Sequence, residues 1–279
     1  MRSLRVGDGL PDDVDGWLTY CGVSDADRRD MLAARPEVGS EWSSEVGLFA
    51  WAWALLAGLP RLRDLHARRG VPDEVTRATV SMLGGVMGTH RQVTGRAGVG
   101  LLELWSPPLR MRGAEYEIGR LAFGRAHLGL GDGVSGYVLM VHIPPGGSLD
   151  ARAAEESIQV AATSFRQWYP EEPISGFVCS SWLLDPQLAE YLGPESNIVR
   201  FQQRFDLLPL LPPDDHSDGD RELMSLGLHL QEPDHPLTED DLAQIPQDTT
   251  LQRAFVAHLR GGRHWYQRTG MLKGHGLAG

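Results

Sequence analysis

The sequence predicts an α+β fold in which a helical N-terminal region precedes a mixed β-sheet with flanking helices. Apolar residues recur at spacings of three and four up to about residue 93, as they do in amphipathic helices. From Tyr116 the period changes to two, and residues 137–186 then read as strand, turn, helix and strand. We therefore expect two domains, a helical one over residues 1–93 and a sheet domain over residues 94–279.

Five helices are expected in the first region. Residues 11–20 form the first, and Ser24 supplies a capping side chain for the second. The apolar residues 46–58 form the third and residues 60–69 the fourth. The fifth begins near Pro72, because proline is tolerated at the first turn of a helix.

The centre of the second region is a predicted β-α-β unit. Residues 137–143 are apolar and bounded by Gly136 and two prolines, as in a strand buried on both faces. Residues 151–168 carry apolar side chains along one helical face. Residues 177–184 form a second apolar run, which we expect to lie parallel to the first strand because a helix connects them.

The PPGGS turn between the first strand and the helix is a candidate anion site. Gly146 and Gly147 permit positive φ, and Ser148 or Asp150 can cap the helix. Free N–H groups beside a helix N-terminus favour phosphate. The turn matches neither GxGxxG nor a P-loop, so a simple chain reversal is the alternative interpretation.

Shorter patterns describe the C-terminal part. Residues 198–210 alternate in polarity and predict a half-exposed strand, and residues 224–230 predict its return strand. Thr249 and Gln252 have the spacing of a capping box and predict a helix start. We expect the chain after Gly270 to be frayed.

Composition limits the function classes. The apolar fraction of 42% and the charged fraction of 23% are those of a globular protein. The formal charge of −11 argues against a nucleic-acid or anionic membrane partner, and the apolar run at residues 48–59 is shorter than the roughly 20 residues of a membrane span. Lys273 is the only lysine, so a catalytic lysine elsewhere is excluded. Cys21 and Cys179 are too few for a disulfide framework, and the N-terminus lacks a secretory pattern, so we expect a cytoplasmic protein.

Simple catalytic and metal motifs are missing. HExxH and GxSxG do not occur, and the acidic residues 212–220 favour a solvated loop over a metal site, so no metal is expected. Ser180 and Ser181 have no histidine or aspartate placed by sequence to activate them as nucleophiles. His142 lies in an apolar run, where a core histidine is the simpler account, and is kept as a catalytic candidate.

Four phrases resemble a known family. They are VHIPPGGSLD at residues 141–150, FVCSSWLLDPQLAEYL at 177–192, SNIVRFQQRF at 196–205 and TTLQRAFVAHLRGG at 249–262. Together they resemble the two-domain GNAT-like N-acyltransferases of actinobacteria, which include the teicoplanin-type glycopeptide N-acyltransferases. The first hundred residues resemble the family's helical N-terminal domain in length and texture.

The resemblance implies a GNAT sheet whose strands at residues 137–143 and 177–184 splay apart to admit the pantetheine arm of an acyl-CoA. The PPGGS turn would meet the pyrophosphate, although the basic residue of the usual GNAT motif is absent. Trp182 would form a wall of the acyl tunnel. The cofactor-binding residues implied in this way are Val141, Ile143, Gly146, Gly147, Ser148 and Trp182.

The resemblance also locates the chemistry. The family motif reads CHSW, with histidine as the proposed general base, where this chain has Ser180 between Cys179 and Ser181. A serine hydroxyl is no base near neutral pH unless another group activates it, so a neighbouring group or water must take that role. Tyr191 is implied as the acid that protonates the leaving thiolate, with a packing role as the alternative.

The function that follows is an acyl-CoA-dependent N-acyltransferase acting on an amine of a small molecule or natural product. The alternative is a catalytically silent acyl-CoA or peptide binding protein with the GNAT fold. Ser180 distinguishes the two hypotheses, because it replaces the family's base.

Overall fold

The computed structural model divides into two compact units. It describes residues 13–33, 44–99, 106–129, 135–210, 217–231, 233 and 235–274. The first unit comprises Met1–Ile118, Ala122–Gly124 and Gln167–Pro170, and the second comprises the rest of the chain. The expected domain boundary at residue 93 stays a prediction.

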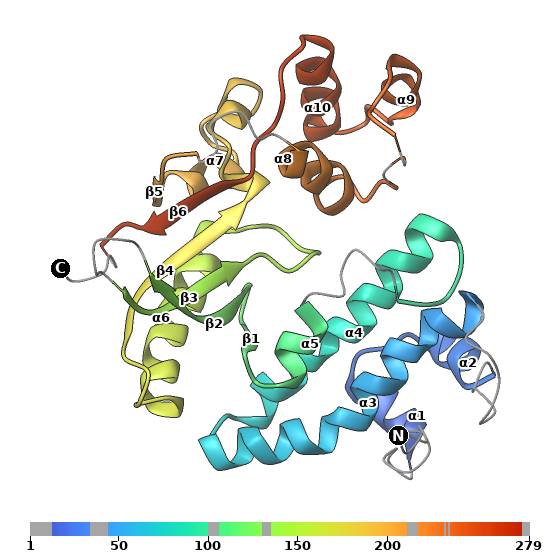
Figure 1. The fold of residues 1–279 in the computed structure, drawn as a ribbon, viewed down its shortest axis with the longest axis vertical. Coiled ribbons are helices and arrows are strands. Elements are labelled where there is room, and N and C mark those ends of the chain that lie inside the picture. Colours follow the sequence, from blue (N-terminus) through green and yellow to red (C-terminus); the bar gives the residue numbers. More distant parts are fainter. Residues whose placement is uncertain are drawn as a thin grey trace. The chain divides into compact units, whose positions relative to one another are not determined.

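The first unit is helical, as the 3.6-residue period predicted (Figure 1). Its helices are α1 (Val14–Tyr20), α2 (Asp25–Ala33), α3 (Ser44–Arg69), α4 (Asp73–Thr94) and α5 (Ser106–Met111). Leu18, Met31, Trp53, Leu59 and Met87 are almost fully buried and form part of one apolar core. Burial of such apolar side chains, more than helix propensity, stabilises these helices.

One boundary in this unit was predicted wrongly. Residues 46–58 and 60–69 form the single helix α3, with Pro60 inside it. Proline removes a helical hydrogen bond and costs about 3 kcal/mol or more in a helix interior. Pro60 is exposed, whereas Leu59 and Leu62 on either side of it are buried, so packing of the two apolar segments keeps the helix continuous.

The described part of the chain contains a six-stranded sheet of order β1-β2-β3-β4-β6-β5. Its strands are β1 (Glu115–Ile118), β2 (Leu121–Gly129), β3 (Ser135–His142), β4 (Ile174–Ser181), β5 (Phe205–Leu207) and β6 (Arg268–Leu272). The change of period at Tyr116 therefore marks the start of the sheet correctly.

The predicted β-α-β unit is confirmed. Helix α6 spans Ala151–Trp168, the bounds expected from the sequence, and β3 pairs with β4 in parallel. Ala154, Ile158, Ala161 and Phe165 are fully buried at the helical spacings that predicted them. The second strand starts three residues earlier than expected and ends at Ser181, where Trp182–Leu184 forms a 3₁₀ turn.

Residues 198–210 were wrongly predicted to be one strand. They contain α7 (Asn197–Gln202) followed by β5. The Ser196 hydroxyl accepts a hydrogen bond from the N–H of Ile198 and starts the helix. Val199, Phe201 and Phe205 are buried as expected, so the pattern predicted burial correctly and backbone conformation wrongly.

Two further C-terminal expectations were wrong. Residues 224–230 form no return strand, because α8 (Ser217–Glu222) continues into a π-helical turn, Leu223–Gly227, with consecutive buried residues at its start. The chain directly after Gly270 is not frayed, since β6 runs to Leu272 and pairs antiparallel with both β4 and β5, and residues 275–279 lie outside the described residues. Figure 1 shows β6, in red, between these strands. The capping box at Thr249 and Gln252 is confirmed at the start of α10 (Thr250–Arg260), and α9 (Glu239–Gln244) precedes it.

His66 is a buried histidine of the first unit. Its Nδ1 atom lies 2.9 Å from the hydroxyl of Thr76, and its ring stacks on Tyr116 with centroids 4.9 Å apart. Its Nε2 atom is buried without a hydrogen-bond partner in the described residues. Burial lowers the pKa of His66 to about 4, because the charged imidazolium is poorly solvated there.

We predict that this histidine destabilises the first unit in acid. The ordinary pKa of imidazole is near 6.5, and the pKa of His66 in the folded chain is about 4. Between these two pH values His66 is protonated in the unfolded chain and neutral in the folded chain, so acid favours unfolding. Over this window the unfolding free energy should fall by about 1.4 kcal/mol per pH unit from His66. Urea denaturation of wild type and His66→Gln at several pH values measures the difference, and parallel pH profiles would contradict it.

Candidate functional site

The described parallel pairing of β3 and β4 ends before the strands themselves do. Their register runs from Tyr137↔Ile174 to Met140↔Val178, with a bulge after Tyr137. Beyond this last described pair, β3 continues to His142 and β4 continues to Ser181. The last residues of both strands therefore lie beyond the described parallel pairing. The splaying of the two strands that the resemblance implied stays a prediction.

Three polar side chains face the same side of the sheet near the C-terminal ends of β3 and β4. Met140 and Val178 are register partners and point to one face, so His142 and Ser180, each two residues further, point to that face as well. Thr269 is the partner of Ser180 on β6, and the two hydroxyl oxygens lie 2.9 Å apart. All three polar residues are half-buried. They provide an imidazole and two hydroxyls at the strand ends.

The opposite face is closed and apolar. Leu139, Val141, Phe177 and Cys179 alternate with the polar positions and are almost fully buried. Burial, and after it the charge of Glu222, raises the pKa of Cys179 to about 12. The thiol is therefore protonated at neutral pH, as expected for an inert buried cysteine, and is no nucleophile.

The PPGGS turn follows β3. Gly146 and Gly147 have φ values of +85° and +67°, and both are exposed with no heavy atom near a Cβ position. Asp150, not Ser148, caps α6, because its carboxylate accepts the N–H groups of Arg152 and Ala153 at 3.1 and 3.0 Å. The Ser148 hydroxyl instead accepts a hydrogen bond from the Asn197 side chain at 2.6 Å.

A carboxylate lies at the end of β4. Glu222 accepts hydrogen bonds from the N–H of Trp182 at 3.3 Å and from the Gln267 side chain at 2.8 Å. Trp182 is buried, and a Cβ atom at Gly227 would come within 2.8 Å of its ring. The π-helical turn therefore lies directly against the indole. Sequence reasoning missed Glu222 and Thr269, since no local pattern indicates contacts across so many residues.

Tyr191 lies in a buried aromatic cluster. Its hydroxyl is 3.0 Å from Nδ1 of His258, whose ring stacks on Trp265 with centroids 3.9 Å apart. Nε2 of His258 donates to the carbonyl of His264 at 3.2 Å, so in the neutral ring Nδ1 accepts and Tyr191 donates. Burial lowers the pKa of His258, which keeps the ring neutral.

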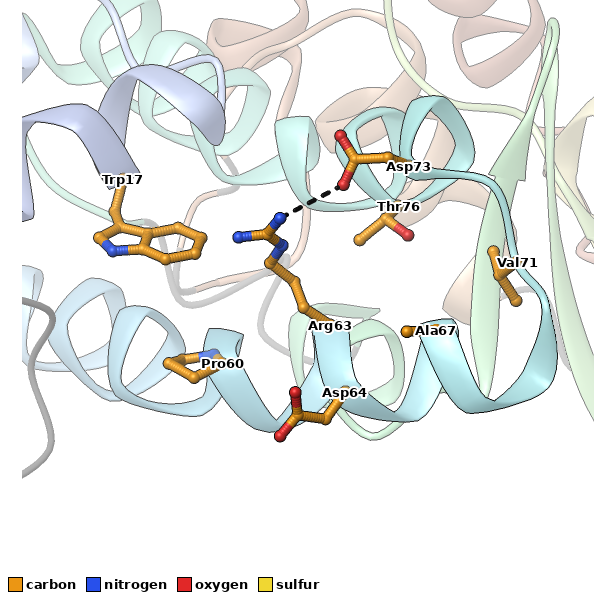
Figure 2. Close-up of a pocket in the computed structure, with 8 residues that line it drawn as sticks. All are labelled: Trp17, Pro60, Arg63, Asp64, Ala67, Val71, Asp73 and Thr76. Carbon is orange, nitrogen blue, oxygen red and sulfur yellow. Dashed lines mark ion pairs between the residues drawn. The ribbon is translucent and has the colours of Figure 1, made fainter.

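The first unit contains a separate pocket of about 430 Å³ between α1, α3 and the start of α4. Figure 2 shows Arg63 between the Trp17 ring and Asp73. The Arg63 guanidinium lies 5.1 Å from the Trp17 ring centroid and 5.4 Å from that of Tyr20. Asp73 pairs with Arg63 at 3.6 Å and accepts the Tyr20 hydroxyl at 2.9 Å.

These contacts pair Arg63, Asp73 and Tyr20 with one another inside the helical unit. Burial, followed by the hydrogen bond to Asp73, raises the pKa of Tyr20 to about 12, so the phenol stays a donor. The cluster links three helices and contains no residue implied as catalytic or cofactor-binding. We interpret this pocket as a stabilising cluster of the helical unit.

Among the described residues no group of three or more histidine, cysteine or acidic side chains could hold a metal ion. Of the aspartates in the expected loop at residues 212–220, Asp214 and Asp215 lie outside the described residues, whereas Asp218 and Asp220 lie in α8, so the expectation of a loop was wrong from Ser217 onward. No described helix is long and apolar enough to cross a membrane.

Comparison with known proteins identifies the family of both parts of the chain. Residues 116–272 match the model of the GNAT-like C-terminal domain, and residues 21–107 match the N-acyltransferase N-terminal domain. A search of curated protein sequences gave no match. The chain belongs to the two-domain N-acyltransferases with a GNAT-like C-terminal domain, as the resemblance implied.

Solved acyltransferase structures resemble the whole chain. A mutant acyltransferase in complex with octanoyl-CoA is 29% identical, with a TM-score of 0.82 over 96% of this chain and 89% of that one. An acyltransferase in complex with CoA and 10C-teicoplanin is 30% identical, with a TM-score of 0.81 over 95% and 88%. One in complex with decanoyl-CoA and teicoplanin is 30% identical, with a TM-score of 0.81 over 97% and 90%.

Proposed function

We propose that this N-acyltransferase takes its acyl group from an acyl-CoA and transfers it to an amine of a small molecule or natural product. The observation that carries the proposal is that the described parallel pairing of β3 and β4 ends at Met140 and Val178, shortly before the PPGGS turn. Similar acyltransferases form complexes with acyl-CoA and with a glycopeptide acceptor, which supports both substrate classes.

In this proposal the donor lies along the end of β3. Val141 lies in the last part of β3 and Ile143 directly follows the strand, and in this proposal their backbone groups pair with the pantetheine amides. The diphosphate lies on the turn at Gly146, Gly147 and Ser148, and Trp182 borders the acyl chain. Exposed glycines let a phosphate approach the backbone closely.

The chemistry is direct attack of the amine nitrogen on the thioester carbon. A C–N bond forms, the C–S bond breaks, the amine loses a proton and the CoA thiolate gains one. We assign the proton-accepting role to His142, because it faces the same side of the sheet as Ser180, the position of the family's base. An imidazole titrates near neutral pH, which suits it to this role. The hydroxyls of Ser180 and Thr269 border the gap from the other side.

Tyr191 remains the proposed acid for the leaving thiolate. The Tyr191 hydroxyl now donates its proton to Nδ1 of His258. To act as the acid it would have to donate that proton to the thiolate sulfur, and His258 would then orient the phenol. A Tyr191→Phe variant with full activity would remove it from the mechanism.

Titration calorimetry with decanoyl-CoA, followed by thiol release with a panel of amines, tests the function. The N-acyltransferase proposal expects binding and amine-dependent release of CoA. Binding without release on any amine would favour the silent binding protein, for which the serine at position 180 is the supporting observation. Absence of binding would overturn the assigned donor.

We predict that His142→Gln lowers kcat by roughly 10² to 10⁴, because a positioned general base is worth that much, and leaves KM for acyl-CoA nearly unchanged. His127→Gln is the matched control, since His127 is also on a strand of the sheet but exposed. Steady-state kinetics of both variants measure the effect. Equal activity of the two variants would show that His142 is not the base.

We further predict that Ser180→His restores activity to His142→Gln. The new imidazole would project from β4 on the same face and reach the reacting amine from the other side of the gap. Ser180→Ala alone should change kcat little if the hydroxyl only pairs with Thr269. A double variant as inactive as His142→Gln would show that residue 180 does not face the reaction centre.

Gly147→Asp should weaken CoA binding by about tenfold or more, because a carboxylate there repels the diphosphate. Gly262→Asp is a matched control for backbone strain: both glycines are exposed, have φ near +70° and have open space at the Cβ position. Calorimetry with CoA compares the two folded variants. Equal affinity in both would place the phosphates elsewhere.

A further inference from the structure

Arg120 contacts the PPGGS turn through all its guanidinium nitrogens. Nε donates to the carbonyl of Ser148 at 2.9 Å, Nη1 to that of Pro144 at 2.9 Å and Nη2 to that of Gly147 at 3.4 Å. The residue directly precedes β2 and lies far from the turn in sequence. A guanidinium has five donors in a fixed plane and no acceptor, so it fits a set of converging carbonyls.

The backbone of Arg120 is itself fixed. Its N–H donates to Oγ of Ser157 at 2.8 Å, and the buried Ser157 donates to the carbonyl of Ala153 within α6 at 2.7 Å. Gly119 has φ +64°, and a Cβ atom there would lie 2.5 Å from the Ser157 hydroxyl. Helix α6 therefore contacts both sides of this arrangement: its first turn binds Asp150, which follows the PPGGS turn, and its Ser157 binds the backbone of Arg120.

This arrangement orients the amides of the turn. In a planar trans peptide the C=O and the following N–H point in opposite directions. Because the carbonyls of Gly147 and Ser148 point to Arg120, the N–H groups of Ser148 and Leu149 point away from it. Hydrogen bonds accepted by a carbonyl also strengthen the donor of the same peptide group.

The Arg120 guanidinium also offsets the negative charge near the turn. The Asp150 carboxylate caps α6 beside the turn and would repel a diphosphate, and the chain as a whole carries a formal charge of −11. Arg120 places a positive charge directly behind the turn peptides. The basic residue that the usual GNAT motif has within the turn is absent here, and a cation from another segment lies at the same turn.

We propose that Arg120 is a positioning residue for the diphosphate of the acyl-CoA donor: it turns the amides of Ser148 and Leu149 away from the guanidinium and supplies the positive charge that the PPGGS turn lacks. This inference rests on the proposed function, because it assumes an acyl-CoA donor on this turn. It concerns donor affinity only and assigns Arg120 no role in bond breaking.

Calorimetry with CoA and with pantetheine, which has no diphosphate, tests the proposal. For Arg120→Met we expect the Kd for CoA to rise about tenfold or more, since charge-assisted contacts are lost, and the Kd for pantetheine to stay unchanged. Arg120→Lys keeps the charge but cannot span three carbonyls, so its CoA affinity should lie between those of wild type and Arg120→Met.

The outcomes separate the two proposals. If wild type does not bind CoA, the proposed donor fails and the role of Arg120 fails with it. If wild type binds CoA and both Arg120 variants lose affinity for CoA and pantetheine by the same factor, Arg120 is only structural. Unchanged CoA affinity in Arg120→Lys and Arg120→Met also overturns the inference. If Arg120→Met does not fold, the CoA-to-pantetheine affinity ratio of Arg120→Lys decides between these outcomes.

Discussion

The proposed site depends on two parallel strands, β3 and β4, whose described pairing ends before the strands themselves end. Backbone N–H and C=O groups are strong hydrogen-bonding groups that cost free energy when they lose a partner away from water. The described pairing of β3 with β4 ends at Met140 and Val178. A ligand with amides, such as a pantetheine arm, can therefore add to β3 as a further strand would. His142 and Ser180 lie on one face of the sheet beyond the described pairing, which is why both enter the proposed mechanism.

The electrostatics of the strand end follow from how α6 begins. A helix N-terminus favours an anion, but the Asp150 carboxylate already occupies two of its amides. A diphosphate at the PPGGS turn must therefore use the peptide N–H groups of the turn itself. Arg120 fits this arrangement, because it binds the carbonyls of Gly147 and Ser148, so that the N–H groups of Ser148 and Leu149 point away from the guanidinium. One helix start thus combines a stabilising cap with a turn suited to an anion.

The sequence predicted best where one local pattern decides the structure. The bounds of α6 follow from an apolar face and a preceding turn, and the capping box at Thr249 is a local signal. It predicted poorly where tertiary contacts override a short pattern, as at α7 and at Pro60. The polar groups around the proposed site come from β6, α8 and the segment before β2, which no spacing rule connects. Arg120 is the example: nothing local indicates contact with residues 144–148.

A crystal structure of the protein with bound CoA would show directly where the donor lies. We expect the pantetheine between the ends of β3 and β4, hydrogen-bonded to the backbone of Val141 and Ile143. We also expect the diphosphate on the N–H groups of Ser148 and Leu149, on the side of the PPGGS turn opposite Arg120. CoA bound away from the ends of β3 and β4, or a diphosphate contacting Arg120 directly in place of the turn amides, would contradict the proposed donor site.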